Sequence, residues 1–354
     1  MARLFDLAET RGSFQVKGKI NGVERDKFYT EKKTKNGKDF RAVNFGCEYD
    51  DKTSVYLSLS GMPQDNVYFS KRNADTGKTE VEKVAWANRN KFNKEGYRMI
   101  GTNLGLVKTT DAEGKEVNDK KTMHAFDACS YIKANMKDDM STFIRGNIEF
   151  SSFIDSEGNT RRSIKYVPGQ ISLCKEVDFD EYDDDNKPVH DFTQTIVFMG
   201  INKEKIDEKD TGRFLVDAKV ITYADIVDVE FIITDSKLAS LFKSKLKSYT
   251  AISVHGHIEV SHKVEEVQDD DSWGETNTMT SVSAPTKTEM IITGATPSTI
   301  DRESYNEKNV SDAIAKIRNA RTAEQNFGSK VNSISDSDSW GDDDSMDDDS
   351  DPWD

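Results

Sequence analysis

Apolar and polar residues alternate along residues 141–174, and this pattern predicts two β-strands. Phe143, Ile148 and Phe150 belong to the first strand, and Ile164, Tyr166 and Val167 belong to the second. The sequence Asp-Ser-Glu-Gly-Asn at 155–159 lies between them and is typical of a hairpin turn. Gly146 interrupts the first strand, and a lone glycine there indicates a bulge or a close backbone approach.

A short pattern, apolar-x-Gly-x-Ile, occurs three times, centred on Gly18, Gly146 and Gly256. The two later copies each follow a stretch with helical spacing of apolar residues. A motif this short also arises by chance, but the shared context favours an internal repeat.

The chain before residue 175 follows the order of one small barrel. Strands are expected at 14–20, 40–47 and 54–59, a helix at 125–136, and then the two strands of 141–174. Residues 62–122 are polar and rich in turn signals, and they form an insertion with its own hairpins. Three strands, a helix and two strands match the five-stranded Greek-key barrel known as the OB-fold.

The same order of strands and helix is predicted a second time, beginning near residue 190. Strands are predicted at 195–199, 214–223, 226–234, 251–260 and 288–293, with a short helix at 238–246 before the fourth. The sequence therefore predicts a mainly β protein with tandem OB-folds. The expected boundaries are 1–175 for the first barrel, 176–191 for an acidic connector, 192–295 for the second barrel, 303–327 for a helix and 328–354 for a disordered acidic tail.

Charge is distributed unevenly along the 354 residues, whose net charge is −15. Residues 1–174 hold 30 Lys and Arg against 24 Asp and Glu, whereas the remainder holds 19 against 40. A basic front half joined to an acidic tail is typical of a nucleic-acid-binding protein, although an ordinary acidic protein remains an alternative.

The acidic tail and the hairpin of 141–174 together resemble bacterial and bacteriophage single-stranded DNA-binding proteins. The chain ends Asp-Asp-Asp-Ser-Asp-Pro-Trp-Asp, and acidic tips of this kind recruit replication, recombination and repair proteins in that family. The resemblance implies a DNA-coating protein of the host or bacterial cytoplasm, with partners such as polymerase, helicase or primase. One difference is that Asp354 follows Trp353, whereas tips of that family usually end on the aromatic residue.

Tryptophans recur in acidic surroundings, at Asp-Ser-Trp-Gly-Glu (271–275) and Asp-Ser-Trp-Gly-Asp (338–342). Solvated acidic segments are normally poor in aromatic residues, so we interpret these tryptophans as docking motifs. The alternative is a solubilising acidic tail in which the tryptophans are incidental. The predicted partner-binding residues are Trp273, Trp340, Asp347, Asp348, Asp349, Asp351, Pro352, Trp353 and Asp354.

Aromatic residues lie among basic ones in three stretches of the front half. Single-strand binding uses aromatic platforms for the bases beside a positive groove for the phosphates. The predicted DNA-binding residues are Arg25, Lys27, Phe28, Tyr29, Lys32, Lys33, Lys35, Lys38, Arg41, Lys71, Arg72, Trp86, Arg89, Lys91, Arg161, Arg162 and Lys165. Phe28, Tyr29 and Trp86 are the favoured stacking residues, whereas Phe40, Phe45 and Tyr166 are equally compatible with a core.

Other classes of function find less support. No motif of a nucleotide-binding loop, a metalloprotease or a catalytic triad is present, so an enzyme is not expected, and no cofactor is predicted. His255 and His257 share a strand face and could bind a metal, but surface histidines are commoner. Three widely spaced cysteines and the lack of a long apolar run favour a reducing cytoplasm and no membrane span. An acidic DNA mimic or adaptor, a virion structural protein and self-association stay open.

Overall fold

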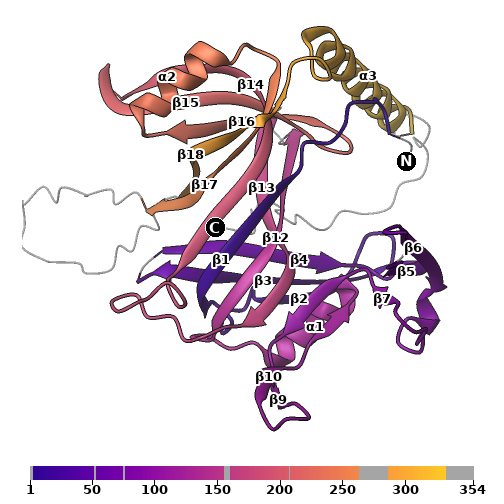
Figure 1. Ribbon diagram of the computed structural model, residues 1–354. Helices are drawn as coiled ribbons and strands as arrows, with labels where there is room; N and C mark the ends of the chain where they lie inside the picture. Colours follow the sequence, from indigo (N-terminus) through magenta and orange to yellow (C-terminus); the bar gives the residue numbers. More distant parts are fainter. Residues whose placement is uncertain are drawn as a thin grey trace, which may run out of the picture.

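The computed structural model describes residues 3–51, 53–74, 76–154, 160–206, 208–262 and 286–331, and it is mainly β (Figure 1). The mainly β prediction is therefore confirmed. None of the helices within these ranges is long and apolar enough to cross a membrane.

Five strands close the first barrel. They are β1 (Gly12–Asn21), β3 (Asp39–Asp50), β4 (Thr53–Gly61), β12 (Ser141–Ile154) and β13 (Thr160–Leu173). The barrel follows the order β1-β3-β4-β13-β12 and returns to β1. All neighbours are antiparallel except β13 and β4, which pair in parallel at Tyr166 and Leu57. The helix α1 (Ala125–Asn135) lies between β4 and β12 in sequence and packs on β3 and β4.

The region between β4 and α1 builds two small additions. A three-stranded sheet consists of β5 (Asn66–Arg72), β6 (Thr79–Ala85) and β7 (Arg98–Met99), with the 3-10 turn η1 (Trp86–Asn88) after β6. A hairpin is formed by β9 (Lys108–Thr110) and β10 (Glu116–Asn118). In contrast, β8 (Thr102–Gly105) and β11 (Lys121–Met123) extend the barrel sheet beside β13, so this region is partly continuous with the barrel.

The second barrel repeats the same connections. Its strands are β14 (Val189–Ile206), β15 (Lys209–Ile221), β16 (Ile226–Ile233), β17 (Thr250–His262) and β18 (Thr286–Asp301). They follow the order β14-β15-β16-β18-β17 and return to β14, and β16 and β18 are the parallel pair. The helix α2 (Ser236–Lys245) again precedes the fourth strand. β14 begins three residues inside the expected connector, and β18 continues to Asp301, beyond the expected end at 295.

The two barrels share one continuous sheet because β1 pairs with β14 over residues 12–17 and 189–194 (Figure 1). Gly146 of β12 and Gly256 of β17 take matching places in the two barrels, each at a bulge. A Cβ at Gly146 would lie 2.0 Å from the carbonyl oxygen of Val167, and one at Gly256 would lie 1.8 Å from that of Ile291. The repeat therefore marks equivalent strands at these two glycines, whereas its third copy, at Gly18, lies in β1 and has no such counterpart role.

Both ends of the described chain pack on the second barrel. Phe5 and Leu7 share a buried cluster with Tyr305 and with α3 (Glu307–Val331), over Val197 of the second barrel. The Tyr305 hydroxyl donates to the carbonyl oxygen of Ala8 at 3.3 Å. The first described residues, which the sequence analysis placed with the first barrel, form no helix or strand before Gly12 and pack on the second barrel, because their apolar side chains are buried under α3.

Candidate nucleic-acid interface

The outer face of β3 and β4 presents a mixed aromatic and polar surface. Val55, Leu57 and Leu59 point into the barrel and are at most 3% exposed, so the alternating residues of β4 must point outward. Tyr56, Ser58 and Ser60 are these residues, and residues directly opposite in a ladder share a face. Their partners on β3 are Gly46, Asn44 and Ala42.

Neighbouring strands add charge to this face. On β2 (Tyr29–Lys33), Lys32 lies opposite the half-buried Phe40 of β3 and is exposed. On β13, Lys165 is exposed next to the inward-pointing Tyr166, which is the partner of Leu57, so Lys165 lies beside Tyr56. We refer to Lys32, Phe40, Asn44, Tyr56, Ser58 and Lys165 as the β3–β4 face.

The β2–β3 hairpin extends this face with further lysines. Its tip turns at Gly37, whose φ of 72° lies in the left-handed region that glycine adopts without strain. Lys33 pairs with Asp39 at 2.7 Å, and this contact lowers the pKa of the Asp39 carboxyl. Lys35 and Lys38 are exposed, and no ion pair to either is found within the described part of the chain. These lysines provide the positive charge that a phosphate backbone requires.

The favoured stacking residues Phe28 and Tyr29 do not lie on this face. Phe28 is 5% exposed and belongs to the core, which corrects the interpretation of this residue as a stacking platform. Tyr29 turns toward α1, where its hydroxyl donates to Glu31 at 2.9 Å and Lys133 lies 4.1 Å from its ring centre. Arg41 pairs with Glu31 at 2.8 Å, so its charge is already compensated.

Trp86 and Arg89 also have a structural role. The Arg89 guanidinium lies 3.9 Å from the Trp86 ring centre and donates two hydrogen bonds to Asp127 of α1, at 2.6 and 3.0 Å. The Trp86 ring contacts Phe126 edge-on. These contacts hold the insertion against α1. A cation–π contact inside the protein and a binding surface give the same basic-aromatic pattern in a sequence.

The remaining predicted residues are spread over the surface. Lys71 is half-buried and approaches the Tyr97 ring, whereas Arg72 and Lys91 are exposed on the insertion. Arg161 and Arg162 are exposed on the arm formed by β12 and β13, where they pair with Phe153 and Ser152. Arg25 and Lys27 lie in the loop before β2. All the predicted partner-binding residues, from Trp273 to Asp354, lie outside the described residues.

The equivalent face of the second barrel has the opposite charge. Lys19 and Val197 take matching places in β1 and β14, and they pair with Glu48 and Lys219. Two residues before Glu48 and Lys219, Gly46 of β3 and Asp217 of β15 also take matching places. Gly46 lies opposite Tyr56 of β4, and Asp217 lies opposite Glu230 of β16. Tyr56 is therefore replaced by a glutamate in the second barrel, and Gly46 by an aspartate.

The model of one protein family, YorF, matches residues 71–330. The chain belongs to the YorF family. The matched region begins in β5 and so leaves out β1 to β4, which carry most of the β3–β4 face.

No curated protein matches this YorF-family chain. Two crystal structures of the single-stranded DNA-binding protein from Thermus aquaticus are similar to it, the wild type and a deletion mutant. Each alignment covers 82% of this chain at 8% sequence identity. It covers 95% of the mutant chain with a TM-score of 0.39, and 93% of the wild-type chain with a TM-score of 0.38. These values are too low to support an argument about function.

Sequence reasoning missed Tyr56, Asn44 and Ser58 of the YorF-family chain. The alternation Val-Tyr-Leu-Ser-Leu at 55–59 carried the signal, because it places a tyrosine on the polar side of a strand. The search for aromatic residues among basic ones passed over Tyr56 because Lys165, which lies beside it on β13, is distant in sequence. No group of three His, Cys, Asp or Glu residues suited to a metal is present in the described ranges, and His257 pairs with Glu259 at 3.0 Å.

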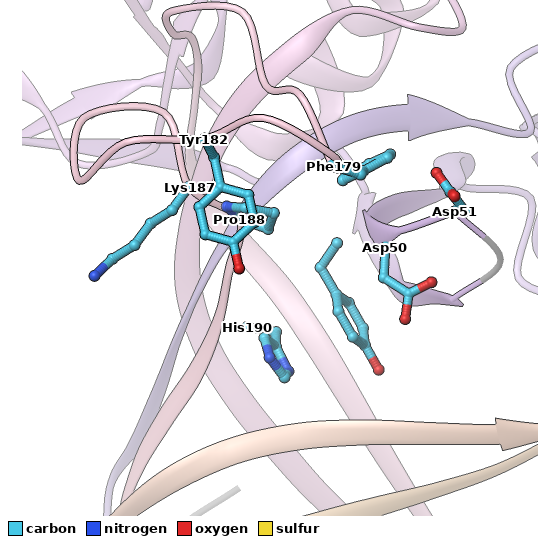
Figure 2. A pocket seen from close by; sticks show the side chains of 8 residues that line it. Asp50, Asp51, Phe179, Tyr182, Lys187, Pro188 and His190 are labelled. Carbon is cyan, nitrogen blue, oxygen red and sulfur yellow. The ribbon is translucent and has the colours of Figure 1, made fainter.

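A pocket of about 370 Å³ lies where the two barrels and the connector meet (Figure 2). Tyr49, at the end of β3, stacks on His190 of β14 with ring centres 4.1 Å apart and planes 2° apart. The Tyr49 hydroxyl accepts from the Val260 backbone N–H at 3.1 Å, so two residues of the second barrel fix the ring of this first-barrel tyrosine. Burial raises the pKa of the Tyr49 hydroxyl, which stays protonated at neutral pH.

Proposed function

We propose that this chain is a sequence-nonspecific single-stranded DNA-binding protein in which the first barrel holds the strand. Each barrel is taken to be an OB-fold, and the strand order first-second-third-fifth-fourth with a helix before the fourth strand supports this assignment. In OB-folds the face of the second and third strands binds oligonucleotides. In the first barrel these strands are β3 and β4.

The observation that carries the proposal is the pairing of two aromatic rings with cations on that face. Tyr56 and Phe40 are partly exposed there, next to Lys165 and Lys32. A stacked base contributes about 1–3 kcal/mol with little sequence preference, and lysines contact the phosphates between bases. Lys35 and Lys38 extend the positive surface along the hairpin.

The second barrel has a different role in this proposal. Asp217 and Glu230 on its equivalent strands repel phosphates, so it supports the first barrel and does not bind the strand on that face. The acidic tail recruits proteins of DNA replication, recombination and repair through Trp340 and Trp353, and the protein acts without enzymatic activity in the cytoplasm.

Fluorescence anisotropy with the full chain tests the proposal. We expect labelled oligo-dT to bind more tightly than a matched duplex, with an affinity that falls steeply as salt rises. Equal or tighter binding of the duplex, or no binding of oligo-dT at low salt, would overturn it. The tail is tested separately by replacing Asp347, Asp348 and Asp349 with Asn, which should weaken the capture of replication proteins in a pull-down.

A further inference from the structure

The pocket between the barrels and the connector has aromatic walls. Tyr49 and His190 line it as a stacked pair. Phe179 and Tyr182 of the connector lie on either side of the opening (Figure 2). Tyr182 is 59% exposed although it lines the pocket, so its ring presents a face to whatever enters.

The connector that carries these rings is held in place by the first barrel. Val177 is fully buried, and its backbone N–H donates to the Ser141 hydroxyl at 3.0 Å. The Asp183 carboxylate accepts from the backbone N–H groups of Asp185 and Asn186, at 2.8 and 3.0 Å. The Phe179 and Tyr182 rings are therefore carried by an ordered loop, and the pocket is already formed without a ligand.

Carboxylates dominate the charge around this opening. Asp50 and Asp51 line the pocket and are exposed. Two lysines nearby are paired with carboxylates, Lys187 with Asp184 at 3.3 Å and Lys175 with Asp183 at 3.6 Å, and Lys17 donates to the Asp185 carbonyl oxygen at 2.5 Å. The site therefore attracts a cation and repels a phosphate.

One cation of the protein already uses an aromatic ring of this wall. The Lys19 ammonium lies 5.1 Å from the Phe179 ring centre, within the range of a cation–π contact. A planar guanidinium is better suited than an ammonium to the space between rings, because it stacks on aromatic faces and pairs with a carboxylate through two parallel N–H groups.

We propose that this pocket binds an arginine side chain of a partner protein, with the guanidinium held by the aromatic rings of its walls and by the carboxylate of Asp51. This site is separate from the β3–β4 face and does not depend on the proposed DNA binding. It would give the protein a second docking point, for a basic segment, in addition to the acidic tail.

Nuclear magnetic resonance of the full chain with ¹³C-labelled tyrosine rings tests this inference. N-acetyl-arginine amide is titrated against N-acetyl-citrulline amide, which has nearly the same shape but no charge. We expect arginine to shift the Tyr49 and Tyr182 resonances, the latter assigned by its loss in Tyr182→Ala, and to bind about fivefold more tightly than citrulline.

Two variants and a matched control complete the experiment. Asp51→Asn and Tyr182→Ala should each weaken arginine binding about fivefold, and neither change disturbs a buried side chain. Tyr223→Ala removes a similarly exposed tyrosine, 53% accessible, from the turn between β15 and β16, and should leave arginine binding unchanged. Oligo-dT affinity should be the same in all three variants.

Three results would overturn the inference: equal binding of arginine and citrulline, unchanged arginine binding in both pocket variants, or tighter binding of thymidine 5′-monophosphate than of arginine at the same rings. The last result would assign the pocket to nucleotides. A failure of oligo-dT binding with arginine binding intact would instead count only against the proposed function.

Discussion

Phe14 lies directly opposite Phe192 where β1 pairs with β14. On its other side, Phe14 faces Gly146 of β12, and Phe192 likewise faces Gly256 of β17. Each phenylalanine is therefore the counterpart of the other, and a local two-fold axis passes between them. The strands of the two barrels are related by this axis, so a matching strand position in one barrel is a natural control for the other.

This arrangement predicts that Gly146→Ala and Gly256→Ala are both destabilising. Each added Cβ would collide with a backbone carbonyl oxygen, at 2.0 and 1.8 Å respectively, and a ladder within a closed barrel cannot move aside freely. We expect each change to lower the free energy of unfolding by about 1–3 kcal/mol, measured by urea denaturation.

Gly169→Ala is the matched control for these two variants. Gly169 also lies in a barrel strand, but the nearest atom to its added Cβ is 3.9 Å away, an ordinary contact distance. Its stability should change little. Equal losses in all three variants would show that strand glycines matter only through backbone entropy and that the close approach has no special role.

The β3–β4 face predicts a loss of DNA binding in Tyr56→Ala. The partly exposed ring is a stacking platform in the proposed function, and its removal should weaken oligo-dT binding by about 1–3 kcal/mol in an anisotropy titration. Glu230→Ala changes the counterpart in the second barrel and should leave the affinity unchanged or slightly higher, because a carboxylate is removed. Similar losses in both variants would mean that the strand crosses both barrels.

The lysines of the β2–β3 hairpin predict a change in salt dependence. Each lysine that contacts a phosphate of single-stranded DNA contributes about 0.7 to the slope of log affinity against log salt. Lys35→Ala combined with Lys38→Ala should therefore reduce the slope by about 1.4 in the same titration. Lys243→Ala, on the exposed side of α2, is the control and should not change the slope; an unchanged slope in the double variant would place the strand elsewhere.

Strand alternation and turn residues were sufficient to predict much of the secondary structure. The helix expected at 125–136 is found as Ala125–Asn135, since its apolar residues repeat at helical spacing and the His124 side chain caps its first turn. The pairing of β1 with β14 could not be predicted, because sequence periodicity shows which face of a strand is buried and not which strand lies beside it. The packing of Phe5 under α3 was missed for the same reason.

The candidate site was predicted less well than the fold, and the reason lies in side-chain partners. Lys32 and Lys165 stand on the face, whereas Arg41 and Arg89 are paired with Glu31 and Asp127. A sequence shows that a cation is present but not whether a carboxylate from another element compensates it. Arg89 has basic and aromatic neighbours in the sequence, as expected of a binding residue, and yet it can have a structural role.

Arg89→Ala provides a test of this distinction. The variant leaves the Asp127 carboxylate, only 23% exposed, without its two hydrogen bonds, and removes the cation from the Trp86 ring. Hydrogen bonds to charged groups contribute about 1.5–3 kcal/mol, so the insertion should open more often and exchange its amide hydrogens faster. Oligo-dT affinity should stay within twofold, and Lys91→Ala should change neither quantity. A large loss of affinity with normal exchange would return Arg89 to the binding surface.

The buried thiols predict a pH dependence of reactivity and stability. Burial raises the pKa of Cys47 and Cys129 to about 12, from an ordinary value of 9.0. Because the thiolate is the reactive form, both should resist iodoacetamide in the folded protein at pH 8 and react after unfolding, as mass spectrometry of tryptic peptides would show. In the unfolded chain they ionise near pH 9, whereas in the folded chain they remain protonated to about pH 12, so their contribution to stability is fully present below pH 9 and is lost as pH rises from 9 to 12. Cys47→Ala should remove part of this alkaline loss, and rapid alkylation of Cys47 in the folded state would show that β3 opens far more readily than its position in a closed barrel implies.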